Sequence, residues 1–192
     1  MHYTTRAPVF FSIAAALFIS IVPARAQQAD TGVAIAEFSA GGIFGLGAHG
    51  SVGGSLGVPT AKHIVPFIAF SYSPLTSYAY NYGANNTGKG LFTSSMLDVN
   101  GGIRIRFTSK SDWVPYVGLG LGLLRLTSSD YTSGFNETAT IKTSMNQLAG
   151  NVSVGGLYYI TPHVGLGLEL KAYDAQHTHF AQATVGAFYQ FP

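Results

Sequence analysis

The chain has 192 residues and not one cysteine, which excludes a disulfide framework and a zinc site built from thiolates. Asp, Glu, Lys and Arg together make up only 9% of it, whereas a soluble domain usually carries about a quarter. Beyond the N-terminal segment, the sequence also lacks an apolar run long enough for a membrane-spanning helix. A chain with so little charge must distribute its apolar residues in some other pattern.

Residues 1–26 have the features of a secretory signal peptide. An apolar run, Phe10–Val22, follows a positively charged residue, and Ala24–Ala26 places small residues at the two positions that define a cleavage site. We therefore expect the exported chain to begin at Gln27. The alternative is an uncleaved anchor, which two flanking prolines disfavour because they leave a run too short to span a bilayer comfortably.

The charge balance changes when this segment is set aside. The whole chain has 10 Lys and Arg against 8 Asp and Glu. Arg6 and Arg25 lie in the predicted signal peptide, so its removal leaves 8 positive against 8 negative residues. We therefore expect no nucleic-acid partner, and residues 27–192 have the length of a single domain.

Apolar and polar residues alternate with a period of two along the remaining chain, most clearly over Met96–Thr108. Successive side chains of a β-strand point to opposite faces, so this segment predicts a strand with one apolar and one charged face. The apolar face carries Leu97, Val99, Ile103, Ile105 and Phe107, and the polar face carries Asp98, Asn100, Arg104, Arg106 and Thr108.

The same alternation, with turn-forming residues between segments, predicts eight strands. These are Ile35–Ile43, Gly50–Val58, Ile64–Tyr72, Met96–Thr108, Val114–Leu124, Gln147–Ile160, Val164–Tyr173 and Phe180–Phe191. Short polar turns alternate with longer connections, and we expect the two longest, Ser73–Ser95 and Thr127–Asn146, to be loops. This inequality is typical of bacterial outer-membrane barrels. The predicted fold is all-β: an eight-stranded antiparallel up-and-down transmembrane β-barrel after a signal peptide.

Charged residues on the polar faces decide which face points inward. They are Glu37, Asp98, Arg104, Arg106, Glu169 and Lys171. A Lys or Arg on the lipid side at mid-bilayer would cost about 2–4 kcal/mol, so these faces must line the lumen. Three negative and three positive charges can pair there, and we expect a structural network in a lumen too narrow for a channel. The alternative is a polar path or a ligand site.

Aromatic residues concentrate near the short turns and the C-terminus, which is typical of a girdle at the membrane interface. The alternative is that aromatic residues favour strands anywhere. The predicted girdle consists of Phe67, Phe107, Trp113, Tyr116, Tyr158, Tyr159, Tyr189 and Phe191.

Motifs for catalysis or metal binding are weak. His177 and His179 form an H-x-H pair with only Asp174 nearby, which is too few ligands for a convincing zinc site. His49 and Ser51 share a strand face, but no carboxylate lies close in sequence to orient the imidazole. Glycine-rich stretches are not followed by a capped helix, so they do not predict nucleotide loops. We expect no catalytic residue, no cofactor and no metal.

The long connection Ser73–Ser95 is rich in tyrosine and asparagine, which give contact area and adaptable hydrogen bonds in binding surfaces. Tyr78, Tyr80, Tyr82 and Asn85 are the candidate binding residues. The alternative is a solvated extension of two strands, in which the tyrosines serve as strand formers.

With these features the chain resembles the small eight-stranded outer-membrane proteins, the family of the OmpA transmembrane domain, OmpX and related surface proteins. The resemblance covers residues 27–192 and includes a C-terminal strand, Phe180–Phe191, similar to the signal read by the barrel-assembly machinery. The sequence departs from that signal because Pro192 follows the last aromatic residue. The resemblance implies a monomer in the bacterial outer membrane, inserted by that machinery and in contact with outer-membrane lipids and lipopolysaccharide.

The resemblance also implies a non-enzymatic anchor that presents surface loops for envelope integrity or for adhesion, with a ligand that the sequence does not identify. A small-solute pore remains an alternative. A lipid A-modifying barrel enzyme, in which His49 and Ser51 would act as a His-x-Ser pair, is another. A soluble lipocalin-like barrel would turn the apolar face inward, and the charged residues near mid-strand argue against it.

Overall fold

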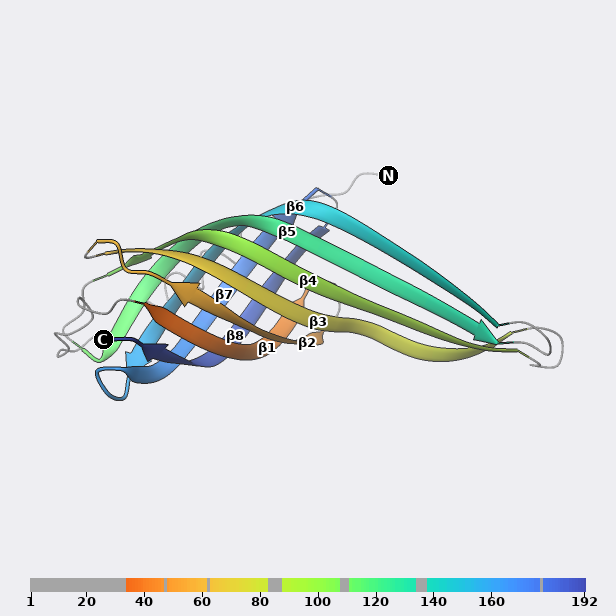
Figure 1. Cartoon of the computed structure of the whole chain (residues 1–192), viewed down its shortest axis with the longest axis horizontal. Helices are drawn as coiled ribbons and strands as arrows, with labels where there is room; N and C mark the ends of the chain where they lie inside the picture. The colour runs from red at the N-terminus through yellow and green to blue at the C-terminus, as the bar shows by residue number, and fades with distance from the viewer. Residues whose placement is uncertain are drawn as a thin grey trace.

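The computed structural model describes residues 34–46, 48–61, 63–82, 88–107, 111–133, 138–176 and 178–192. The predicted signal peptide, residues 1–26, lies outside them. Eight antiparallel strands pair in sequence order, and β1 pairs with β8 to close the barrel (Figure 1). The predicted fold class is therefore confirmed. Within the described ranges, no helix is long and apolar enough to cross a membrane.

The strands differ in length in a way that the sequence pattern does not reveal. They are β1 (Ile35–Phe44), β2 (His49–Gly57), β3 (Ile64–Tyr82), β4 (Gly88–Arg106), β5 (Trp113–Ser133), β6 (Thr138–Tyr159), β7 (Val164–Ala175) and β8 (Thr178–Gln190). The expectation that Ser73–Ser95 and Thr127–Asn146 form loops is wrong, because β3 to β6 continue through most of both segments. These segments are rich in Thr, Ser and Tyr, and the cross-strand ladder supplies the backbone hydrogen bonds that extended chains require.

Outward-facing side chains form an apolar belt around the barrel. In each strand the belt covers about nine residues, which matches the length a tilted strand needs to cross a bilayer. One exposed example from each strand is Phe38, Val52, Ile68, Val99, Leu119, Val152, Leu168 and Val185. A soluble barrel would place such residues inside, so the apolar face points outward as the alternation predicts.

Four strands continue past the belt, while β1, β2, β7 and β8 end at the rim (Figure 1). The continuation consists of residues 73–82, 88–96, 125–133 and 138–148, and we call this four-stranded sheet the extension. Each strand adds about ten residues, or roughly 30 Å of extended chain. At the opposite end the strands are joined by the short turns.

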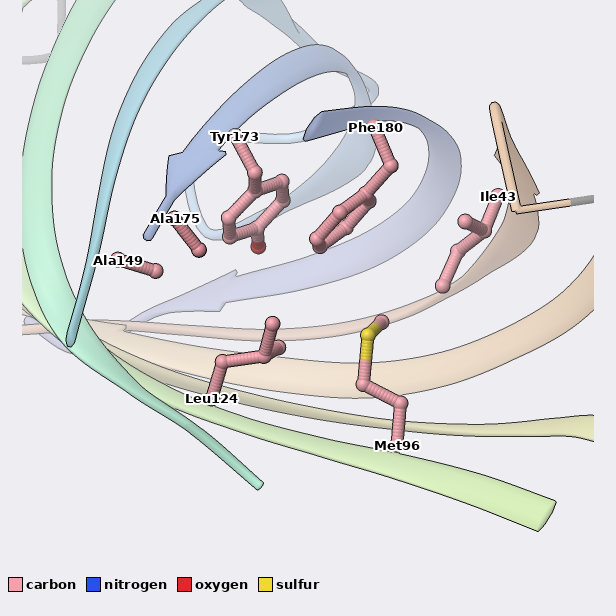
Figure 2. Close-up of a cluster of buried hydrophobic side chains, with 7 residues drawn as sticks. All are labelled: Ile43, Met96, Leu124, Ala149, Tyr173, Ala175 and Phe180. Carbon is pink, nitrogen blue, oxygen red and sulfur yellow. The ribbon is translucent and has the colours of Figure 1, made fainter. Parts of the chain in front are cut away.

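Two apolar clusters lie inside the barrel, one at each end. The rim cluster, below the extension, consists of Ile43, Met96, Leu124, Ala149, Tyr173, Ala175 and Phe180, whose side chains point toward one another across the lumen (Figure 2). The Tyr173 and Phe180 rings stack with centroids 4.4 Å apart. The turn-end cluster consists of Ile35, Val114, Tyr116, Leu157 and Phe188. Buried polar side chains occupy the lumen between them.

Candidate functional site

Arg104 lies at the centre of the polar lumen and joins three strands. Its guanidinium donates from Nη1 to Glu37 Oε2 on β1 at 3.1 Å and faces Glu169 Oε1 on β7 from Nη2 at 3.4 Å. All three side chains are less than a tenth exposed. Buried charges are tolerated only when they are paired and hydrogen-bonded, so this triad holds β1, β4 and β7 in one arrangement across the lumen.

Two aromatic rings complete the surroundings of Arg104. The guanidinium carbon lies 4.8 Å from the Phe67 ring centroid and 4.9 Å from that of Tyr116. A desolvated guanidinium over an aromatic face is stabilised by about 2 kcal/mol or more. The rings also exclude water, which strengthens the ion pairs beside them.

The other predicted lumenal charges are distributed around this triad. Lys171 Nζ lies 3.4 Å from Glu169 Oε2. Asp98 lies nearer the rim and accepts hydrogen bonds from Tyr173 Oη at 2.7 Å and Asn100 Nδ2 at 2.6 Å. Arg106 is buried on the same face of β4, two residues nearer the short turns.

The hydrogen bonds continue from Asp98 to the rim cluster. Tyr173 Oη also lies 3.2 Å from Gln182 Oε1, and Gln182 Nε2 donates to Ser51 Oγ at 2.7 Å. Tyr173 therefore belongs to both the polar network and the rim cluster. Neither Gln182 nor Tyr173 is among the predicted site residues, although alternation along Phe180–Phe191 places Gln182 on the same face as Thr184 and Gln190.

Inward-facing glycines of β5 make room for these side chains. A Cβ on Gly118 would meet Ser153 Oγ and would come within 3.6 Å of Arg104 Cγ. A Cβ on Gly120 would lie 2.8 Å from the Asn151 side-chain amide. Glycine at these positions is therefore required by close packing of larger polar groups.

The predicted aromatic girdle is wrong for three of its eight members. Phe107, Tyr158, Tyr189 and Phe191 are exposed near the short turns, and Trp113 is partly buried beside Tyr158. Phe67, Tyr116 and Tyr159 instead point into the lumen. Strict alternation would have identified two of these residues, because Tyr116 precedes outward Val117 and Tyr159 follows outward Tyr158. For Phe67 both faces of the segment are apolar, so alternation gives no signal.

Buried side chains occupy the described lumen between its two ends. A polar cavity lined by Glu37, Asp98, Arg104 and Lys171 has a volume of about 20 Å³, enough for about one water molecule. Apolar clusters lie above and below it. The arrangement is therefore suited to holding the barrel together rather than to passing solutes.

The weak catalytic and metal motifs are not assembled into a site. His49 Nε2 contacts the Leu46 carbonyl oxygen at 3.0 Å, whereas Ser51 Oγ accepts from Gln182. His179 Nδ1 lies 2.9 Å from Asp174 Oδ1, with both side chains exposed, and His177 lies outside the described residues. In the part of the chain that the structure describes, no three His, Asp or Glu residues are grouped to hold a metal.

The three candidate tyrosines lie on a strand of the extension, not in a loop. Tyr78 and Tyr80 lie on β3, on the face that continues the barrel interior. The Tyr78 ring stacks on Phe92 of β4 with centroids 5.3 Å apart, and Tyr80 Oη donates to Asp130 of β5 at 2.6 Å. Tyr82 is the last residue of β3, with its side chain outside the described part, and Asn85 is also outside it.

The two faces of the extension differ in chemistry. The inner face carries this aromatic group together with Leu126, Ile141 and Met145, of which Ile141 is 66% exposed. The outer face is rich in Ser and Thr and carries two exposed cations, Arg125 and Lys142, with no carboxylate among its described residues. Arg125 lies just beyond the apolar belt, two residues after Leu123.

A closed barrel with an apolar outer belt and an ion-paired lumen defines an integral membrane β-barrel. Residues 11–191 match the family described as "Outer membrane protein beta-barrel domain". The chain belongs to this family and is a bacterial outer-membrane barrel protein. A comparison with curated proteins finds no match.

Several solved structures share the fold. Neisserial surface protein A is 15% identical with a TM-score of 0.57, covering 82% of this chain and 97% of its own. Ail, the attachment invasion locus protein of Yersinia pestis, is 13% identical with a TM-score of 0.51 and the same coverage. A major outer membrane protein from Thermus thermophilus is 14% identical with a TM-score of 0.54, covering 82% and 99%. At these identities the likeness concerns the fold alone.

Proposed function

We propose that this protein is a non-enzymatic outer-membrane anchor that presents the extension to the cell surroundings as an adhesive surface. The observation that carries the proposal is the continuation of four strands about ten residues past the apolar belt. A paired sheet holds its side chains in fixed positions, so a partner would bind with less ordering cost than on free loops.

The orientation follows the usual sidedness of this class, with short turns in the periplasm and the longer segments outside. The lack of cysteine makes this easy to test, because a single introduced thiol has no competitor. Ser129→Cys on the extension should react with a membrane-impermeant maleimide on intact cells. Thr161→Cys, in the turn between β6 and β7, should react only after the outer membrane is opened. The reverse pattern would overturn the orientation.

Two surfaces of the extension support binding. The inner face offers the ring group of Tyr78, Tyr80 and Phe92, a residue type that gives large contact area at low entropic cost. The outer face offers Arg125 just above the belt, where the phosphates of lipopolysaccharide lie, and Lys142 four positions farther out along the β5–β6 ladder. We propose that Arg125 contacts lipopolysaccharide headgroups, while Lys142 attracts an anionic partner to the extension and the inner-face rings add contact area.

Neither alternative function has comparable support. A pore would need a continuous lumen, whereas the described lumen is filled between two apolar clusters. A lipid A-modifying enzyme would need His49 to contact Ser51, and these side chains have other partners. The barrel therefore serves as the anchor and the extension as the binding surface.

Cell adhesion of a shortened variant tests the proposal. Replacing residues 77–93 and 129–142 with two-residue Asn-Gly turns would join the paired residues Thr76 with Ser94 and Ser128 with Thr143. The rim cluster and the belt would remain. Ail has been solved with the heparin analogue sucrose octasulfate, so a heparin-coated surface is a suitable probe.

Cells that display the full chain should adhere to heparin, and cells that display the shortened barrel should not. Equal surface amounts and an intact heat-modifiable gel shift are the controls for folding and export. Equal adhesion by both variants, or no adhesion by the full chain, would overturn the proposed adhesive role.

A further inference from the structure

The wall of the barrel carries a long apolar trough on its outer side. The trough has a volume of about 900 Å³ and crosses β4 to β8, with Phe44 of β1 at one end. Outward side chains such as Leu119, Val152 and Ala172 line it. Two residues of its lining, Lys171 and Gln182, also line the lumenal cavity, whereas Leu119, Val152 and Ala172 line the trough alone.

Strand pairing shows the direction of the trough. Leu119 pairs with Val152, Val152 with Ala172, Ala172 with Ala181, and Ala181 with Phe44. At the other end, Leu119 pairs with Ile103, three residues from the short-turn end of β4, whereas Phe44 is the last residue of β1 at the rim. The trough therefore runs diagonally across the belt, from the end near the short turns to the rim below the extension.

Small side chains make the trough deep near the rim. Ala172, Ala181 and Ala183 lie between the larger side chains of Leu170 and Phe44. Each alanine leaves the space that a leucine or valine fills elsewhere on the belt. The deepest part therefore faces the leaflet next to the extension.

Polar groups begin where the trough meets the rim. Asp174 follows Ala172 by two residues on β7, and His179 precedes Ala181 by two on β8, so both share the outward face. Their exposed side chains are in contact, with His179 Nδ1 2.9 Å from Asp174 Oδ1. The surface is therefore apolar along the trough and polar at one end, which matches an amphiphile with its headgroup at the rim.

We propose that this trough is a specific site for one acyl chain of the acylated, phosphorylated glycolipid of the outer leaflet. The site lies within the belt, so an acyl chain is the ligand that surrounds it. The choice of leaflet rests on the orientation given under Proposed function, because the alanines and the polar end lie on the extension side. A chain packed in the trough gains more apolar contact than one beside a convex wall.

Native mass spectrometry of the full chain tests the site. The protein would be refolded with hexa-acylated lipid A or with phosphatidylethanolamine and then exchanged into detergent. The wild type should keep one lipid A through the exchange. Ala172→Phe with Ala181→Phe fills the trough and should lower the retained lipid A at least about tenfold, because each lost methylene contact weakens binding several-fold.

Ala187→Phe is the matched control, since Ala187 is an exposed outward alanine of β8, outside the trough lining and four residues from Ala183. It should retain lipid A like the wild type, and a heat-modifiable gel shift should show that all variants fold. Equal retention by the filled variant and the control, or preferential retention of phosphatidylethanolamine by the wild type, would overturn the site. Heparin adhesion should be unchanged in the filled variant, so failure of this site and failure of the adhesive role are distinguishable.

Discussion

Replacement of Arg104 by methionine would test whether the lumenal ion pairs hold the barrel together. Methionine keeps the approximate length of the side chain but removes the charge that faces Glu37 and Glu169. Removing one partner of a buried ion pair costs about 3–5 kcal/mol, because the other charge remains buried without compensation.

The low end of this range applies here. Glu37 would keep the hydrogen bond from Ser55 Oγ at 3.1 Å, and Glu169 would keep Lys171 at 3.4 Å. We expect Arg104→Met to lower the free energy of unfolding by about 3 kcal/mol, or roughly 100-fold in the equilibrium constant. Arg104→Met with Glu37→Gln should recover half of this loss or more, because the second change removes the uncompensated charge.

Urea unfolding in lipid vesicles provides the assay. The gel mobility of unboiled samples reports the folded barrel, and fluorescence of Trp113, the single tryptophan, reports the same transition independently. Arg125→Met is the control with the same chemical change at an exposed position, and should alter stability by less than about 0.5 kcal/mol. If Arg104→Met unfolded at the same urea concentration as the wild type, the lumenal ion pairs would not be a stabilising feature of this barrel.

Two further predictions concern the barrel wall and the lumen. Gly102→Ala should lower the free energy of unfolding by about 1–3 kcal/mol, because its Cβ would collide with backbone atoms of Leu119 and Gly120. Gly50→Ala is the control, since a Cβ there meets nothing within 4 Å, and equal urea midpoints for the two variants would contradict the packing argument. In planar bilayers the reconstituted protein should show no stepwise conductance, because apolar clusters lie at both ends of a filled lumen. Discrete conductance steps that persist after purification would contradict this prediction and support a pore function.

The extension shows why the sequence pattern underestimates a strand. Within the belt, hydrocarbon outside and charge inside impose a strict alternation, so Leu97 and Asp98 reveal their faces. In the described residues of the extension both faces meet water, and Ser or Thr can occupy either one. The alternation therefore disappears although the strands continue. Only the pairing between neighbouring strands, such as Tyr78 with Phe92, shows that the strands continue.

The candidate site shows the same division. The sequence indicated which charges belong inside, because lipid excludes them from the other face. It could not indicate that Arg104 faces Glu37, 67 residues away, since that choice depends on the stagger of all strands around the barrel. The aromatic rings of Phe67 and Tyr116 over Arg104 depend on the same stagger.

Local alternation thus determined the strands of the belt, their facing and the class of protein, because the membrane acts on each residue separately. The tertiary structure decided the pairing of lumenal charges, the length of the extension and the trough on the wall. Each of these features brings together residues from strands far apart in the chain, and a short-range pattern carries no information about such contacts.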